Sequence, residues 1–150
     1  MSDNFIVLIP LDPRFVPDAS RRETARRRFA AMAWGAAEVE METLDETRFF
    51  DCGENFERVL CPSCRSEIPE AWWKARMSDD QSGETFRLEA YVTPCCAARH
   101  DLNQLVYQWN MGFARFALRA RNPRGEIDDG YRWELENVLG VRLRLIHARY

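Results

Sequence analysis

The hydrophobic residues of positions 1–43 predict two strands with a helix between them. An unbroken apolar run over residues 5–9 is typical of a strand that is buried on both faces and central in its sheet. Strict alternation over residues 38–42 predicts a strand with one face in the core and three glutamates on the other. Asp18 or Ser20 can cap the intervening helix. The apolar face of that helix repeats at helical spacing and comprises Ala25, Phe29, Met32 and Ala33.

The positions 114–150 repeat this order of elements. Residues 114–121 alternate as a strand, and residues 127–138 carry apolar side chains at helical spacing, with Gly140 just past the helix end. Residues 141–148 alternate again as a last strand. The order β-α-β, β-α-β is the split, ferredoxin-like pattern. It predicts an α+β fold: a four-stranded antiparallel sheet in the strand order 4-1-3-2, with two helices on one face.

Two consequences follow from that strand order. The second strand lies beside the third, so its outward glutamates face the arginines of the third strand, and such opposite charges stabilise neighbouring strands. The residues concerned are Glu38, Glu40 and Glu42 on one strand and Arg115, Arg119 and Arg121 on the other. The first strand is apolar on both faces, so the open face of the sheet also needs a cover, either the rest of the chain or a second subunit.

Four of the five cysteines are candidate metal ligands, and all five lie in residues 44–113, which we expect to form a zinc-binding module inserted into the core of residues 1–43 and 114–150. The four candidates form two close pairs, Cys61 with Cys64 and Cys95 with Cys96. Four thiolates in two pairs can surround one metal ion tetrahedrally, and Zn²⁺ is the usual occupant. Adjacent side chains point apart in a regular strand, so the backbone must turn at Pro94 for both Cys95 and Cys96 to bind. If it does not, His100 is the alternative fourth ligand.

The inserted residues predict elements of their own. We expect strands at residues 56–60 and 85–92, a short helix at 71–77, a polar loop at 78–83 and a helix from Asp101 to Trp109. Ligands at a strand-turn knuckle and at a helix start resemble those of zinc ribbons and treble-clef zinc modules. The resemblance covers about 45 residues and rests on the four cysteines. It implies a structural zinc ion. The adjacent second pair departs from the usual Cys-x-x-Cys spacing of such modules.

Two other roles for the cysteines are alternatives to a structural zinc site: thiol–disulfide exchange and catalytic zinc. Cys61-Pro62-Ser63-Cys64 resembles a glutaredoxin-type active site, which implies thiol–disulfide exchange with Cys61 and Cys64 as the reactive pair. A catalytic zinc site keeps an open position, and a four-thiolate site is closed. The sequence carries no phosphate-binding glycine loop, nucleophile elbow or zinc-protease motif, so we assign no catalytic residues. Cys52 is expected to be a free thiol.

Composition favours a globular protein that acts by binding. The 150 residues are 46% hydrophobic and 30% charged, with a net charge of −3, which argues against a protein that coats nucleic acid. No apolar run is long enough to cross a membrane, and no signal-peptide pattern opens the chain, so we expect a cytoplasmic location. Lys74 is the only lysine, and five arginines cluster within residues 21–28. That cluster is either a solvated helix face or a patch for an acidic partner.

The resulting functional prediction is a non-enzymatic, zinc-containing binding or adaptor protein. Its partner would be another protein, or a second copy of the chain, engaged through the open sheet face or through aromatic residues of the insert. A nucleic-acid-binding protein is the alternative, since zinc ribbons and open four-stranded sheets also serve that role. A thiol–disulfide oxidoreductase is the third candidate.

Overall fold

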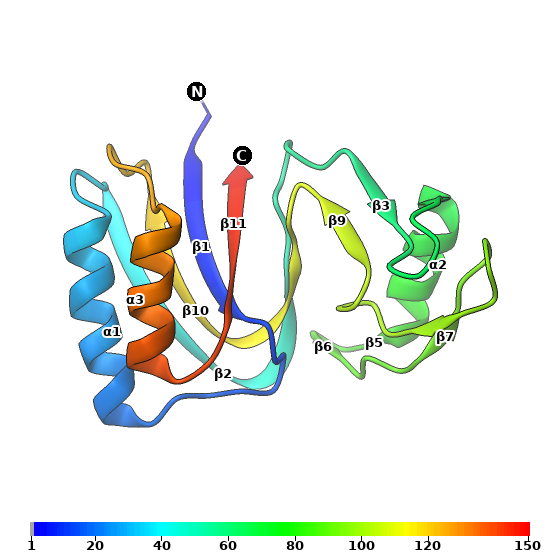
Figure 1. The fold of residues 1–150 in the computed structure, drawn as a ribbon, viewed down its shortest axis with the longest axis horizontal. Helices are drawn as coiled ribbons and strands as arrows, with labels where there is room; N and C mark the ends of the chain where they lie inside the picture. Colours follow the sequence, from blue (N-terminus) through cyan, green and yellow to red (C-terminus); the bar gives the residue numbers. More distant parts are fainter. Residues whose placement is uncertain (1) are drawn as a thin grey trace.

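The computed structural model describes residues 2–150 and shows a mixed α+β fold with three helices in that range. Two helices and four strands form the larger part (Figure 1). They are β1 (Asn4–Pro10), α1 (Ala19–Met32), β2 (Glu38–Phe50), β10 (Gly112–Arg121), α3 (Asp129–Leu139) and β11 (Leu143–Arg149). The chain between β2 and β10, residues 51–111, is called the cysteine segment below.

The four long strands form one antiparallel sheet in the order β11-β1-β10-β2. This is the order and the pairing that the sequence predicts for the four strands of the core. β1 lies between β10 and β11, as expected for a strand that is apolar on both faces. Each of the two helices α1 and α3 is capped by an aspartate just before its first residue. Asp18 accepts a hydrogen bond from Arg21 N, and Asp128 accepts one from Tyr131 N.

The sheet separates two hydrophobic cores. On one face, Ile6 and Leu8 of β1 pack with Phe29 of α1 and Leu135 of α3, all buried. On the other face, Val7 and Ile9 belong to a core that includes Leu102, Leu105 and aromatic residues of the cysteine segment. Figure 1 shows α1 and α3 on one side of the large sheet and the cysteine segment, with α2, on the other. The segment therefore covers part of the face that the sequence left open.

The cysteine segment is also fastened along the free edge of β11. Asn110 Nδ2 donates to Leu145 O at 3.1 Å, and Asn55 Nδ2 donates to His147 O at 3.0 Å. Glu54 N donates to Arg149 O at 2.8 Å. Because these donors occupy carbonyl groups that an edge strand would otherwise expose, they also reduce the tendency of β11 to pair with another chain.

The cross-strand charge prediction is confirmed for two of the three arginines. Arg121 Nη2 lies 3.8 Å from Glu38 Oε2, and Arg119 Nη1 lies 3.7 Å from Glu42 Oε1. Arg115 makes no such pair with these glutamates, because the register shifts between Ala114 and Phe116. Arg115 Nε donates instead to Leu44 O at 3.1 Å.

Short elements make up the cysteine segment. They are β3 (Arg58–Leu60), β4 (Glu67–Ile68), α2 (Glu70–Asp80), β5 (Gln81–Ser82), β6 (Thr85–Phe86), β7 (Tyr91–Val92), β8 (Arg99–His100) and β9 (Val106–Gln108). Of the described helices, α2 included, none is long and apolar enough to cross a membrane.

Three sequence predictions for this region need correction. The helix expected from Asp101 to Trp109 is a turn followed by β9, and Asp101 caps the turn by accepting from Gln104 N. The strand expected over residues 85–92 is broken between β6 and β7, where Leu88 has a φ of 55°. The polar loop at 78–83 is the end of α2 followed by β5. In addition, β2 continues to Phe50, eight residues past its expected end.

Candidate metal centre

The first cysteine pair lies in a tight turn between β3 and β4. Cys61 N donates to Ser66 O at 2.9 Å, and Arg65 N donates back to Cys61 O at 2.9 Å. Arg65 has a φ of 66°, a left-handed conformation that lets the chain reverse directly after Cys64. The turn directs the side chains of Cys61 and Cys64 to the same side of the hairpin.

The second pair lies in a turn of the same construction between β7 and β8. Thr93 N donates to Ala98 O at 2.8 Å, Ala97 N donates to Thr93 O at 3.2 Å, and Ala97 has a φ of 60°. Each position of this turn corresponds to the position 32 residues earlier, as Thr93 does to Cys61. Both turns therefore read x-Pro-x-Cys, and each is framed by a two-stranded antiparallel pair.

This correspondence explains the adjacent cysteines. Cys96 occupies the position of Cys64, but Thr93 stands where Cys61 stands in the first turn, and Cys95 stands where Ser63 does. The second turn thus supplies its two sulfurs from its third and fourth positions instead of its first and fourth. The turn beginning at Pro94, which the sequence required for both residues to bind, is present.

The four sulfur atoms lie close enough to hold a metal ion, all within 4.8 Å of one another. Cys61 Sγ is 3.7 Å from Cys96 Sγ, and Cys64 Sγ is 3.3 Å from Cys95 Sγ. A tetrahedral ion with metal–sulfur bonds of about 2.3 Å requires sulfur–sulfur separations of about 3.8 Å. The Cys61–Cys96 distance fits this requirement. The Cys64–Cys95 distance would have to lengthen by about half an ångström, which small χ1 rotations of these exposed side chains can supply.

The hydrogen bonds of the first turn favour thiolates. Burial raises the pKa of Cys61, but N–H groups of Cys64 and Ser63 outweigh it, and the pKa falls to about 6. The side chain and backbone of Ser66 lower the pKa of Cys64. Burial, and then hydrogen bonds to the sulfurs of Cys64 and Cys61, raise the pKa of Cys95 to about 12. The cluster therefore holds protons that a metal ion would displace on binding.

Aromatic residues pack in the same buried cluster as Cys61. Trp73 of α2 stacks on Phe56, with ring centroids 5.4 Å apart, and donates from Nε1 to Tyr107 Oη at 3.1 Å. Tyr107 in turn donates to Leu102 O at 2.6 Å. Trp73 and Tyr107 are buried and belong to the same core as Val7 and Ile9 of the large sheet, whereas Trp109 is 46% exposed.

A buried carboxylate fixes the chain that leads to the second turn. Asp80, at the end of α2, is fully buried and accepts from Leu88 N at 2.8 Å and Glu89 N at 2.9 Å. Tyr91 Oη donates to the same carboxylate at 2.9 Å. Residues 87–90 have no strand partner, so Asp80 takes the place of one.

The remaining candidates lie outside the four-sulfur cluster. His100 is next to it, but its Nε2 lies 2.7 Å from Ser63 Oγ and it is not part of the group of sulfurs that can share an ion. Cys52 is buried in the large core, with its sulfur 3.9 Å from Trp109 O. Of the arginines in the cluster of residues 21–28, three are paired with carboxylates: Arg21, Arg26 and Arg28. This arrangement favours the solvated-face interpretation.

Sequence reasoning missed Thr93. It is a buried polar residue whose Oγ1 lies 3.6 Å from Cys96 Sγ and 3.9 Å from Cys61 Sγ, and it donates to Ala98 O at 3.2 Å. The sequence held a signal for this residue, since aligning the two Pro-x-Cys sequences places Thr93 on Cys61.

Comparison with known proteins gives no further guide: no family model, curated protein or solved structure matches the chain.

Proposed function

We propose that the chain is a non-enzymatic binding or adaptor protein whose cysteine segment is a zinc-ribbon-like module inserted into a ferredoxin-like domain. The observation that carries the proposal is the cluster of four sulfurs within 4.8 Å at the tips of two equivalent turns. A soft, all-thiolate, tetrahedral donor set suits Zn²⁺, and a closed set of four protein ligands suits a structural role. The strand order β11-β1-β10-β2, with two helices on one face, supports the ferredoxin-like assignment.

The sizes of the local elements support a structural role for a metal. Every strand of the cysteine segment has only two or three residues, which is too short for independent stability. A metal ion that joins two such hairpins can supply the missing free energy, as in other small zinc modules. The core residues Trp73 and Tyr107 then pack against a fixed frame.

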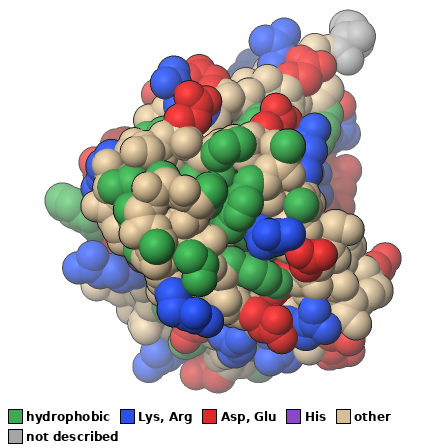
Figure 2. Space-filling model, turned by 90° about the vertical axis from the view of Figure 1, so that its right-hand side faces the viewer, with side chains coloured by type: hydrophobic (Ala, Val, Ile, Leu, Met, Phe, Trp, Pro, Cys, Tyr) green, Lys and Arg blue, Asp and Glu red, His purple; other side chains and the backbone are tan. Residues whose placement is uncertain are grey.

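A binding role is supported by the surface of the segment. Figure 2 shows hydrophobic side chains gathered on the side of the molecule that the segment forms. Arg76 lies between two aromatic rings, 5.7 Å from Trp72 and 6.0 Å from Tyr91, and the neighbouring Val92 is 48% exposed. Trp, Tyr and Arg are the residue types that dominate protein–protein contacts. We assign this patch, Trp72, Arg76, Tyr91 and Val92, to a protein partner.

Metal analysis of the purified protein tests the metal centre. We expect one zinc per chain in the wild type, loss of zinc in Cys95→Ser, and retention of zinc in His100→Ala and Cys52→Ser. A protein without metal, with four titratable thiols, would contradict the structural-zinc proposal. Loss of zinc in His100→Ala with retention in Cys95→Ser would move the fourth ligand to His100.

Affinity capture with the zinc-loaded protein tests the partner. A specific partner should be lost in Trp72→Ala and kept in Trp133→Ala, because Trp133 is 60% exposed but lies on α3. Salt-sensitive binding of single-stranded RNA or DNA instead would favour the nucleic-acid alternative. Reduction of a model disulfide that disappears in Cys61→Ser would favour the oxidoreductase, although Cys61 is fully buried.

A further inference from the structure

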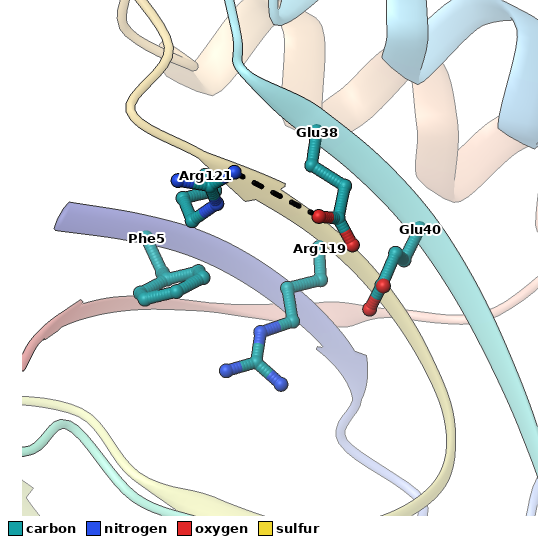
Figure 3. Close-up of a pocket in the computed structure, with 5 residues that line it drawn as sticks. All are labelled: Phe5, Glu38, Glu40, Arg119 and Arg121. Atoms are coloured by element: carbon teal, nitrogen blue, oxygen red, sulfur yellow. Dashed lines mark ion pairs between the residues drawn. The ribbon is translucent and has the colours of Figure 1, made fainter. Parts of the chain in front are cut away.

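A polar pocket lies on the part of the open sheet face that the cysteine segment leaves uncovered. It has a volume of about 250 Å³ and is lined by five residues of three neighbouring strands: Phe5, Glu38, Glu40, Arg119 and Arg121. Figure 3 shows these side chains around one common space, with the glutamates on one strand and the arginines on the next. This volume is slightly below the roughly 300–1,000 Å³ of pockets for drug-sized molecules, so it suits a small ligand.

The two arginines hold donors that the protein does not use. Within the described chain, neither Arg119 nor Arg121 donates a side-chain hydrogen bond, and their carboxylate neighbours lie 3.7 to 3.9 Å away. These distances exceed those of hydrogen bonds. Arg119 Nε is buried without any partner. The guanidinium side chains of Arg119 and Arg121 are each about a third exposed, so an acceptor from outside can reach them.

Arg119 is also held in place. Its guanidinium lies 4.5 Å from the centre of the Phe5 ring, a cation–π contact that keeps it against the floor of the pocket. The planar fork is therefore positioned before any ligand arrives, which lowers the entropic cost of binding a carboxylate.

The opposite wall is negative. Glu38 and Glu40 are two residues apart on β2 and so point to the same face of the sheet. Hydrogen bonding to Glu38, and then repulsion from it, raises the pKa of Glu40. Two neighbouring carboxylates repel each other, and a cation placed between them would relieve that repulsion.

From this arrangement we infer that the pocket binds a free α-amino acid. The carboxylate of the ligand would accept from Arg119 and Arg121, its ammonium group would donate to Glu38 and Glu40, and its side chain would lie against Phe5. The glutamates would repel a simple anion such as phosphate. The arginines would repel a simple ammonium cation. Only a ligand with both charges within a few ångströms satisfies both walls. The inference does not depend on the metal centre.

Titration of the zinc-loaded full chain with each of the twenty standard L-amino acids tests this inference, with backbone amide NMR shifts as the readout. At least one amino acid should bind saturably and shift the signals of β1, β2 and β10. Its deaminated and its decarboxylated analogues should each bind at least tenfold more weakly, since each loses charge-assisted hydrogen bonds. Absence of binding by all twenty, or equal binding of the carboxylic acid alone, would overturn the assignment.

Variants give a second, independent measurement. Arg121→Gln and Glu40→Gln should each weaken binding at least tenfold, whereas Arg27→Gln should not change it. Arg27 is an exposed residue of α1, on the helical side of the sheet, so it is a matched control for loss of one positive charge. Affinity that is unchanged in both pocket variants would overturn the assignment, provided circular dichroism shows the wild-type fold.

Discussion

Replacement of Asp80 by asparagine should destabilise the protein far more than its small change in shape suggests. The carboxylate is fully buried and accepts three hydrogen bonds, from Leu88 N, Glu89 N and Tyr91 Oη. An asparagine side chain has one acceptor oxygen and one NH₂ group. In either orientation, its NH₂ group therefore faces a backbone N–H that has lost its acceptor.

The expected loss can be worked from these contacts. A hydrogen bond to a charged group contributes about 1.5 to 3 kcal/mol, and a buried donor left unpaired costs about 1 to 3 kcal/mol. Because the remaining oxygen still accepts one or two of the three hydrogen bonds, we expect Asp80→Asn to lower the free energy of unfolding by about 2 to 4 kcal/mol. Asp80→Ala removes all three acceptor contacts and should cost at least as much.

Urea unfolding of the purified protein, followed by far-ultraviolet circular dichroism, measures this difference. Asp79→Asn is the matched control, because Asp79 is an exposed neighbour whose one ion pair within residues 2–150 is with Arg76. That change should cost less than about 1 kcal/mol. A chelator competition should also show weaker zinc binding for Asp80→Asn, since Asp80 fixes the chain that leads to Cys95. Equal unfolding free energies for the two variants would refute the role given to Asp80.

Two further predictions concern the chain around Cys52. Gly53→Ala should lower the free energy of unfolding by about 1 to 3 kcal/mol, because Gly53 has a φ of 60° and a Cβ there would collide with Arg149 O. Gly83→Ala is the control at a similar φ with open space around it, and a cost as large as that of Gly53→Ala would contradict this reasoning. Burial, then repulsion from Asp51, raises the pKa of Cys52 to about 11 from an ordinary value near 9.0. Because the folded-state pKa is the higher one, the stability contributed by this thiol is complete below pH 9.0 and is lost as the pH rises towards 11. The unfolding free energy of Cys52→Ala should therefore fall less steeply with pH over that interval than the unfolding free energy of the wild type. Equal slopes for the two proteins would count against a raised pKa of Cys52.

The large sheet was predictable because its pattern is local. Residues 5–9 and 38–42 reveal their burial by sequence alone, and the caps Asp18 and Asp128 mark the helix starts. The strand order then follows from the repeated β-α-β unit. The continuation of β2 to Phe50 could not be read in the same way, because its last residues pair with Gly112–Ala114, about 60 residues further along the chain.

The cysteine segment was less predictable, since its conformation depends on contacts between distant residues. Apolar residues from Leu102 to Trp109 have helical spacing, yet β9 forms because residues 106–108 pair with β3. Likewise, the break before β7 depends on the carboxylate of Asp80, which no local pattern reveals. The four sulfurs of the candidate site were identified from spacing alone. What made their meeting possible, the left-handed residue Ala97, has no signature in its side chain.

The two equivalent turns have a consequence for the order in which the chain folds. β2 and β10 must find each other across a loop of about 60 residues, and closing such a loop costs conformational entropy. An ion held between residues 61 and 96 would shorten the effective loop to fewer than about 30 residues and lower that cost by roughly 0.7 kcal/mol. A bound metal would then act on the folding rate of a sheet that contains none of its ligands, with the hairpins of the cysteine segment assembling before the sheet closes.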